Sequence, residues 1–295
     1  MSRDVLAGNH WARHLTWRLM RILARDLNPR SLHLLARGVA DVVWFIDAPG
    51  RRTVDDNLAP LIPDHAARQR VVRRCYRACA EQLAFTLRLD RRPLRDPRHR
   101  ELIDPQGVFK LRPRNGPVII AASHMDWDIA LAILQSHNLV QDIAVVALPA
   151  GDSWIDHELA HLRSCSGAQT LPWASAARAS LAHLRAGKTL GVLADRPYSA
   201  GDRSSLTVST NGRYRRVPLG PADLARRSGA ILIPVAVVQG ALVVGGAYAP
   251  RTASDVRLAT QAIAAFHLRA IATAPGRWVA FHRIWEPCAH LHAMG

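Results

Sequence analysis

The sequence is poor in lysine and cysteine, and it has no long hydrophobic run free of charges. Lys110 and Lys188 are the only lysines among 39 Lys and Arg residues. Of the four cysteines, Cys75 and Cys79 stand one helical turn apart, and no pair of CxxC motifs is present, so the spacing of a structural zinc site is missing. We expect these two cysteines to pack within a helix, and we expect no metal site. Because no segment has the pattern of a cleaved secretion signal, we expect a reducing, cytoplasmic compartment.

Negative charge is also scarce. The chain carries 39 Lys and Arg residues against 23 Asp and Glu residues, which gives a net charge of +16. Such a surface attracts anions, and nucleic acid, anionic lipid headgroups and an acidic carrier protein are the partner classes that fit. The arginines are spread along the whole chain, and no helix-turn-helix, zinc or RNP-type motif occurs, so a nucleic-acid-binding protein is the less favoured alternative. We expect no nucleic acid partner.

The N-terminal residues have a basic amphipathic pattern. Residues 10–25 place apolar side chains at helical spacing with arginines between them, a pattern typical of helices that lie in a membrane interface. A second apolar segment, residues 32–46, contains Arg37 and Asp41, so it is too short and too charged for a transmembrane helix. We expect a surface-associated amphipathic hairpin, with two ordinary helices packed on the core as an equally weighted alternative.

The rest of the chain alternates between apolar runs and helical patterns. A long helix is expected over 64–88. We expect strands near 117–122, 143–148, 189–194, 230–238, 241–247 and 277–284, and helices near 127–137, 155–164, 175–186, 219–228 and 254–274. This alternation predicts an α/β fold with a mostly parallel central sheet flanked by helices on both faces. No linker or repeat interrupts it, so we expect an N-terminal helical region over 1–50 and one α/β domain over 51–295.

One strand delivers a histidine and two carboxylates to the carboxyl edge of the expected sheet. The apolar run 118–122 leads into a segment that contains His124, Asp126 and Asp128, and open α/β folds place their chemistry at that edge. An imidazole whose far nitrogen is held by a carboxylate is a general base near neutral pH. His124 is therefore the candidate base. The alternative is a helix N-terminus in which Ser123 caps the helix and both aspartates complement its dipole.

A second charged pair follows another expected strand. The strand near 189–194 runs into Asp195 and Arg196, which would face the same crevice as His124 if the two strands are neighbours. Arg196 could hold a phosphate or polarise a carbonyl group. A salt bridge at the strand end is the alternative.

A glycine marks the entrance of the helix expected near 219–228. Gly220 would leave backbone N–H groups free to meet an anion or an oxyanion. The loop before it carries Arg213, Arg215 and Arg216. These arginines fit a phosphate contact and a solvated hairpin tip equally well.

Several short motifs occur in a fixed order along the chain. They are Asn57-Leu58 before a long helix, His124 with Asp128, Arg163 with Gly167 and 168–171, Ala194-Asp195-Arg196, Gly220-Pro221-Ala222, Ser228-Gly229-Ala230 with Ile233-Pro234-Val235, and a block from Pro275 to Trp285. Over roughly residues 50–287 this set resembles the bacterial lysophospholipid acyltransferase superfamily, in the branch of the lipid A late (lauroyl and myristoyl) acyltransferases and the phosphatidylinositol mannoside acyltransferases. The C-terminal block is the most specific piece.

The resemblance implies an O-acyltransferase. Such an enzyme moves a fatty acyl group from a thioester of acyl carrier protein or CoA to a hydroxyl group of a glycolipid or related lipid acceptor. It works as a peripheral protein at the cytoplasmic face of the inner membrane, where the membrane surface is anionic, and it needs no cofactor besides the thioester co-substrate.

The family motif is a His followed, after four intervening residues, by Asp or Glu, whereas three residues separate His124 from Asp128. Because Trp127-Asp128 matches the end of the motif, Asp128 is the expected acid partner, and Asp126 is the alternative. A helix that starts at His124 would place Asp128 at i+4 on the same face.

These residues suggest a mechanism. His124 would remove the proton from the acceptor hydroxyl while Asp128 orients the imidazole. The residues expected to bind substrate or the oxyanion are Arg163, Asp195, Arg196 and Gly220. The alternatives are a thioesterase that uses the same histidine to activate water and a family member that binds acyl chains or membranes without turnover.

Overall fold

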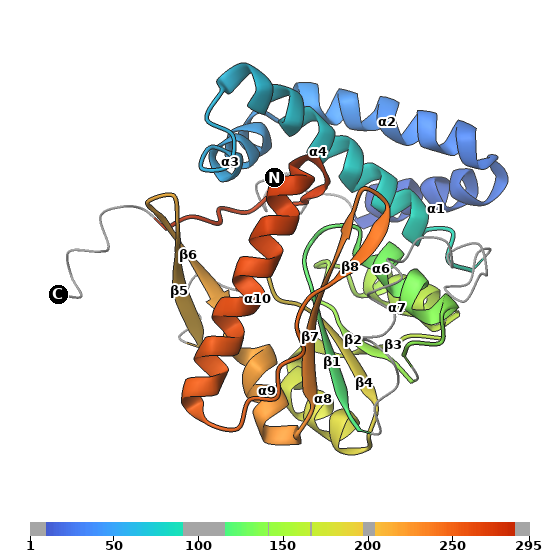
Figure 1. The fold of residues 1–295 in the computed structure, drawn as a ribbon. Coiled ribbons are helices and arrows are strands. Elements are labelled where there is room, and N and C mark those ends of the chain that lie inside the picture. Colours follow the sequence, from blue (N-terminus) through green and yellow to red (C-terminus); the bar gives the residue numbers. More distant parts are fainter. Residues whose placement is uncertain (1–9, 91–115, 141, 166, 197–203, 287–295) are drawn as a thin grey trace.

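A six-stranded sheet forms the centre of the fold (Figure 1). The computed structural model describes residues 10–90, 116–140, 142–165, 167–196 and 204–286. The strand order is β3–β2–β4–β1–β7–β8. The strands are β1 (Val118–Ala122), β2 (Ala144–Val146), β3 (Gln169–Leu171), β4 (Thr189–Leu193), β7 (Ile231–Val238) and β8 (Ala241–Val244). All are parallel except β8, which is antiparallel to β7, so the predicted mostly parallel α/β sheet is confirmed.

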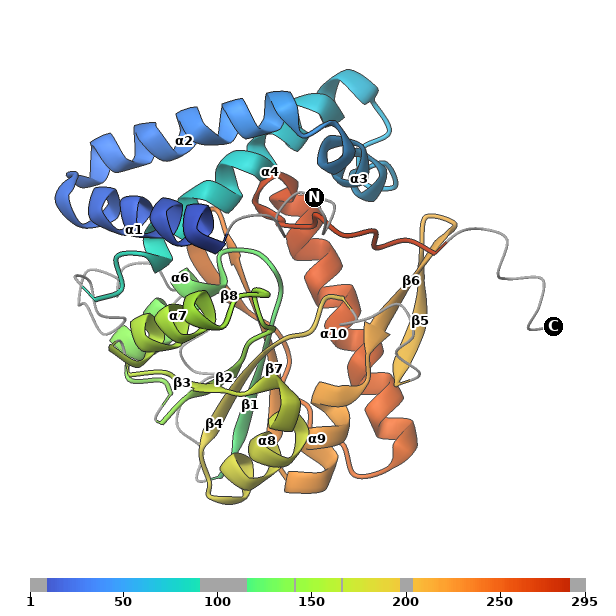
Figure 2. The ribbon, with the colours of Figure 1, turned by 180° about the vertical axis from the view of Figure 1, so that it is seen from behind.

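Helices cover both faces of this sheet (Figures 1 and 2). One face is covered by α6 (Trp127–Ser136) and α7 (Ser153–Cys165), and the other by α8 (Ala176–Arg185), α9 (Gly220–Ser228) and α10 (Ala253–Thr273). Successive side chains of a strand point to opposite faces, and both faces are buried here. Residues of β1 therefore alternate between the two cores, Ile119 on the α8–α10 side and Ile120 on the α6 side.

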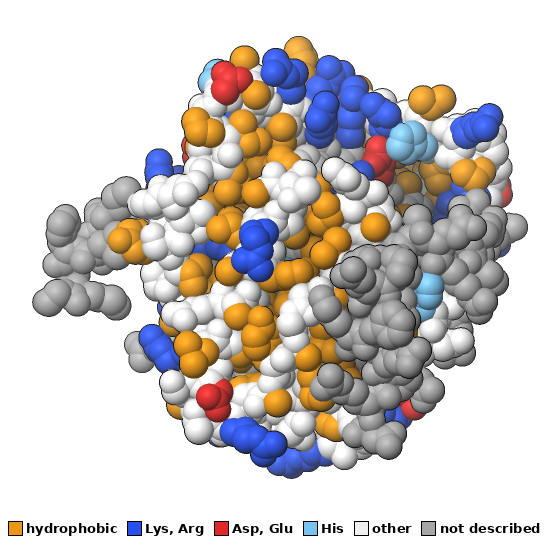
Figure 3. Space-filling model, in the orientation of Figure 1, with side chains coloured by type: hydrophobic (Ala, Val, Ile, Leu, Met, Phe, Trp, Pro, Cys, Tyr) orange, Lys and Arg blue, Asp and Glu red, His pale blue; other side chains and the backbone are white. Residues whose placement is uncertain are grey.

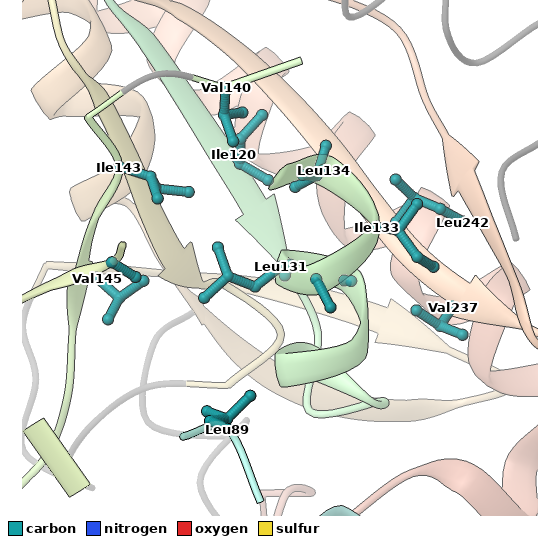
Figure 4. Close-up of a cluster of buried hydrophobic side chains, with 14 of the residues drawn as sticks. Leu89, Ile120, Leu131, Ile133, Leu134, Val140, Ile143, Val145, Val237 and Leu242 are labelled. Carbon is teal, nitrogen blue, oxygen red and sulfur yellow. The ribbon is translucent and has the colours of Figure 1, made fainter. Parts of the chain in front are cut away.

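The core on the α6 side is built from large aliphatic side chains (Figure 4). Ile120 of β1, Val145 of β2 and Val237 of β7 pack there with Leu131 and Ile133 of α6. Burial of each such side chain contributes about 1.5–3 kcal/mol. This packing fixes α6 against the carboxyl ends of the strands, directly after the His124 segment.

Four helices form the N-terminal part and lie together at one end of the sheet (Figure 1). They are α1 (His10–Asp26), α2 (Pro29–Ile46), α3 (Ala48–Leu58) and α4 (His65–Thr86). The side chain of Asn28 caps α2 by accepting a hydrogen bond from the Ser31 N–H, and Asp64 caps α4 in the same way through Ala67. The short α3 and the exact bounds of α2 were not predicted from the sequence.

The predicted N-terminal hairpin is present as α1 and α2, and a narrow stripe of it is buried. The buried positions are Trp17, Ala24, Leu32 and Ala40. Large apolar side chains on the rest of the pair are exposed, namely Trp11, Leu15, Leu19, Ile22, Leu34, Leu35, Val39, Val42, Val43, Phe45 and Ile46. None of the described helices has a stretch both long and apolar enough to traverse a bilayer.

The strand expected over 277–284 is wrong. A 3-10 turn, η3 (Pro275–Arg277), is followed by an extended segment outside the sheet. The buried Asn57 of α3 satisfies its backbone: Nδ2 donates to the carbonyl oxygens of Ala280 (2.8 Å) and His282 (2.7 Å), and Oδ1 accepts from the Ile284 N–H (3.0 Å). Because one amide side chain supplies these partners, the segment needs no neighbouring strand.

The segment before α9 is a hairpin of β5 (Ser205–Thr210) and β6 (Arg213–Pro218), as in the hairpin alternative considered from the sequence, although the two strands themselves were not predicted. Asn211 and Gly212 form its turn with positive φ angles of 47° and 73°, the pattern of a tight hairpin. The expectation of a solvated tip is wrong for Arg215, which is buried in β6. Further short elements, β3 and the 3-10 turn η2 (Trp173–Ser175), were also missed.

The cysteines of α4 have the predicted packing role. Cys75 is buried and Cys79 half-buried, and both are free thiols. Burial raises the pKa of Cys75 to about 12, so this thiol stays protonated and unreactive. Cys165 is free and exposed, and Cys288 lies outside the described residues.

Candidate active site

Two neighbouring strands bring His124 and Asp195 together. β1 and β4 pair in parallel with Ala122 opposite Leu193, and the Ala194 N–H donates to the Ala122 carbonyl oxygen at 2.8 Å. The residues that follow the two strands therefore meet at the same edge of the sheet. The prediction that Asp195 and Arg196 would face His124 is confirmed in this geometry.

The carboxylate of Asp195 contacts both the imidazole ring and the backbone N–H of His124. The distance from His124 Nδ1 to Asp195 Oδ1 is 2.6 Å, and the His124 backbone N–H donates to Oδ2 at 3.1 Å. The indole Nε1–H of Trp278 also donates to Oδ2, at 3.0 Å. The carbonyl oxygen of His124 accepts from the Val279 N–H at 2.9 Å. These contacts fix the position of the imidazole ring.

Asp195 is fully buried and ionised. Burial opposes ionisation of this carboxyl group, but the charge and hydrogen bond of His124, the charge of His267 and the hydrogen bond of Trp278 outweigh it and hold the pKa of Asp195 well below its usual value. A buried carboxylate with this many partners stabilises an imidazolium on His124 without taking the proton itself.

The second ring nitrogen of His124 is an acceptor. Arg196 Nε, which always carries a proton, donates to His124 Nε2 at 3.1 Å. The proton of the neutral ring therefore lies on Nδ1 and points to Asp195. In this tautomer the Nε2 lone pair is the basic site.

The expected acid partners of His124 have other contacts. Asp128 accepts a hydrogen bond from the Thr86 hydroxyl and lies 3.8 Å from Arg163 Nε. Asp126 accepts from Arg277, with Nε at 2.7 Å. Within the described contacts the predicted His124–Asp128 pair is therefore corrected to His124–Asp195.

The reason for this correction lies in where α6 begins. An i+4 pairing requires a helix that starts at His124, but α6 begins at Trp127. Asp126, the residue before it, has a left-handed backbone with φ 51°, a conformation that Asp tolerates better than most residues. The chain therefore turns between His124 and Asp128, and the two side chains do not share a helix face.

A cavity of about 440 Å³ opens beside His124. Its polar residues are His124, Arg163, Arg196, Asp156 and Thr170. Its walls are mostly apolar and come from the start of α6, from β2, α7 and β3, and from the end of β4, with Trp127, Val145, Val146, Leu148, Leu159, Leu171, Trp173 and Leu193 among them. A mostly apolar cavity with a few polar groups beside the histidine fits an acyl chain whose carboxyl carbon lies near His124.

Of the remaining predicted site residues, one lies at the cavity and one does not. Arg163 lines the cavity beside Arg196. Gly220 begins α9 and is not among the described residues that line this cavity. Throughout the ranges that the structure covers, no group of three or more His, Cys, Asp or Glu side chains is placed to hold a metal ion.

Two buried residues behind the site, Arg215 and His267, have roles that were not predicted from the sequence. Arg215 donates from Nη1 to the carbonyl oxygen of Asp195 (2.9 Å) and from Nη2 to that of Ala264 (3.0 Å), so it ties the Asp195 loop to α10. His267 lies within hydrogen-bond distance of the Ala121 carbonyl oxygen (Nε2, 3.1 Å), and burial lowers its pKa to about 4. Their spacing along the chain contains no local signal, because each acts across the fold.

Comparison with known protein families identifies one match. The family described as bacterial lipid A biosynthesis acyltransferase matches residues 2–286, which is nearly the whole chain. A comparison with curated proteins finds no match.

Proposed function

Because the chain belongs to the bacterial lipid A biosynthesis acyltransferase family, we propose that it transfers a fatty acyl group from an acyl thioester to a hydroxyl group of a lipid acceptor, with His124 as the general base. The observation that carries this proposal is the state of one imidazole. Its Nδ1 is held by the buried Asp195, and its Nε2 is an acceptor beside an apolar cavity.

The proposed reaction uses this geometry. The acceptor O–H gives its proton to His124 Nε2 while its oxygen attacks the thioester carbonyl carbon, and Asp195 stabilises the imidazolium that forms. The tetrahedral intermediate carries an oxyanion, for which Arg196 and Arg163 are the cations at the cavity. The C–S bond then breaks, the thiolate takes the proton from Nε2, and the ester product remains. Asp195 acts through His124 and is a positioning residue.

The apolar cavity is the proposed site of the donor's acyl chain. Leu159 of α7, Leu171 of β3 and Leu193 of β4 line it, and Trp127 is the contribution of α6. The expected donors are acyl carrier protein and acyl-CoA. Both are anionic, and the net charge of +16 favours their approach to this surface.

The exposed apolar side of α1 and α2 is the proposed membrane contact. Members of this family are membrane-associated, and a helix pair with apolar side chains outward and arginines between them suits the interface of an anionic bilayer. We propose peripheral binding at the cytoplasmic face of the inner membrane, where both a thioester donor and a lipid acceptor can reach the site.

The test is acyl transfer by His124→Gln against the matched variant His157→Gln, whose residue is exposed on α7. Purified protein is given radiolabelled acyl-CoA or acyl carrier protein thioester with a bacterial lipid extract, and labelled lipid and free fatty acid are separated. We expect His124→Gln to lose about 100- to 10,000-fold in transfer and His157→Gln to keep wild-type activity. Transfer that survives in a correctly folded His124→Gln protein would overturn the proposal, and free fatty acid as the main product with acceptor present would identify a thioesterase instead.

A further inference from the structure

A second and larger cavity lies away from His124. It has a volume of about 760 Å³ and is bounded by α2, α4, the start of α6 with Asp126, the turn between β7 and β8, and residues 273–277. His124 and Arg196 are not among its described lining residues. The reaction proposed above makes no use of this cavity.

The cavity is lined by four arginines and two carboxylates. The arginines are Arg37, Arg74, Arg77 and Arg277, and the carboxylates are Glu81 and Asp126. Four positive charges less two negative ones leave +2 on the lining. Such an excess in a concave site favours an anionic ligand.

Both carboxylates of the cavity already have a cation. The guanidinium group of Arg277 is paired with Asp126, with Nε at 2.7 Å from Oδ2, and with Glu81 through Nη1. Arg77 is likewise paired, with Asp41, which it shares with Arg73. These carboxylates are therefore paired with Arg77 and Arg277, and they do not neutralise Arg37 and Arg74.

Arg37 and Arg74 carry the excess charge. Over the ranges that the structure describes, neither lies within ion-pair distance of a carboxylate; the polar contact of Arg37 is a 3.5 Å approach to His33 Nε2. Room for Arg74 depends on Gly276, since a Cβ atom there would come within 2.9 Å of the Arg74 Cβ. Arg37 of α2 and Arg74 of α4 both line the cavity, and a guanidinium group is the side chain best suited to bind two phosphate oxygens at once.

The surroundings indicate what carries the phosphate. Leu34, one helical turn before Arg37 on α2, is exposed, as is Leu35. In Figure 3 Lys and Arg side chains gather over α2 and α4, with hydrophobic side chains close by. We propose that this cavity binds the phosphoryl headgroup of a lipid through Arg37 and Arg74, with the lipid's acyl chains along the apolar side of α2.

Two sources could supply this headgroup: a phosphorylated acceptor and an anionic membrane lipid. The shared chemistry is a phosphate ester on a lipid. The inference uses the lipid chemistry of the family but does not depend on the role of His124, and it is tested by binding alone.

The experiment measures binding of dihexanoylphosphatidic acid to the full chain by titration calorimetry. The test protein is Arg37→Gln/Arg74→Gln, and the charge-matched control is Arg178→Gln/Arg257→Gln, two exposed arginines on α8 and α10. We expect Kd to rise at least tenfold in the test protein and to stay within twofold of wild type in the control. Dihexanoylphosphatidylcholine, which has the same chains and no net charge, should bind weakly to all three proteins. His124→Gln should bind like wild type.

Equal affinities in the test and control proteins would overturn the proposal, as would no measurable binding to wild type. Thermal unfolding confirms that the variants fold. Sedimentation with phosphatidylcholine vesicles, with and without phosphatidylglycerol, then separates the sources. If the test protein binds phosphatidylglycerol-containing vesicles more weakly than the control does, and both bind phosphatidylcholine vesicles equally, the site binds an anionic membrane lipid. If vesicle binding is unchanged while phosphatidic acid binding is lost, the site serves a phosphorylated acceptor.

Discussion

Arg196 donates its Nε–H to His124 Nε2 at 3.1 Å, so its guanidinium group occupies the direction from which an acceptor hydroxyl must approach. For proton transfer the hydroxyl has to take that position within hydrogen-bond reach of Nε2. Arg196 also lines the acyl cavity. If the Arg196 side chain moves from the imidazole to the thioester oxygen, Nε2 of His124 becomes accessible to the acceptor hydroxyl and the oxyanion gains a hydrogen-bond donor.

Replacing Arg196 by Gln should therefore lower kcat. Loss of one hydrogen-bond donor to an oxyanion costs about 100-fold or more, and freeing His124 Nε2 of its contact with Arg196 does not replace that donor. The measurement is steady-state transfer at saturating donor and acceptor. Arg216→Gln, in the β5–β6 hairpin outside the cavity lining, is the control. An unchanged kcat in Arg196→Gln would show that the oxyanion is stabilised elsewhere.

An Asp→Asn substitution at each position shows whether Asp195 or Asp128 positions the imidazole of His124. Asp195→Asn removes the charge that holds the Nδ1–H tautomer and should lower kcat by about 100-fold or more. Asp128→Asn keeps a hydrogen-bond partner for Thr86 and should change kcat by less than about fivefold, since Asp128 has no described contact with the imidazole.

Thermal unfolding accompanies both assays, because each aspartate has buried partners. The opposite order, with Asp128→Asn the inactive protein, would restore the pairing expected from the sequence motif.

The sequence predicted the strand ends better than the pairing between them. Uninterrupted apolar runs located β1 and β4 closely, because parallel strands are buried on both faces. The partner of His124 was misassigned because a spacing argument reaches along one element, whereas Asp195 lies 71 residues away in sequence. The left-handed residue at Asp126, which separates His124 from α6, has no signal strong enough to read beforehand.

The C-terminal block shows a second limit. Residues 278–281 form an apolar run like that of a buried strand. The backbone partners of the segment are instead the side chain of Asn57, the carbonyl oxygen of His124 and a bridge between Met125 and Trp278. Such partners depend on the completed fold. The family resemblance nevertheless singled out both Asn57 and the block, although it did not show that they touch.

The exposed apolar side of α1 and α2 predicts the strength of membrane binding. Trp11 and Phe45 are each 74% exposed, and burial of such a side chain contributes about 1.5–3 kcal/mol. The double variant Trp11→Ser/Phe45→Ser should therefore bind phosphatidylcholine–phosphatidylglycerol vesicles at least about tenfold more weakly. Leu258→Ser removes an exposed apolar side chain from α10 and should have no effect. Equal sedimentation of all three proteins would place the membrane contact on another face.

His267 predicts how stability depends on pH. In the folded protein burial lowers its pKa from 6.5 to about 4, although the charge of Asp195 opposes the shift and that of Arg215 adds to it. Between these two values the unfolded chain binds more protons than the folded one, so the free energy of unfolding falls as pH falls. The loss from pH 6.5 to pH 4 amounts to about 3 kcal/mol.

His267→Gln removes this titration and retains a donor for the Ala121 carbonyl oxygen. Urea unfolding at pH 7 and pH 4.5 should therefore show a smaller loss of stability in His267→Gln than in wild type, whereas the exposed His157→Gln should follow wild type. The lowered pKa of Asp195 acts in a different window, because its contribution to stability is present above the usual pKa of an aspartate and is lost only at more acidic pH. The pKa of His282 is also lowered, but its effect is common to all three proteins and cancels. Parallel curves for wild type and His267→Gln would mean that His267 is protonated in the fold, and a cation would then lie directly behind Asp195.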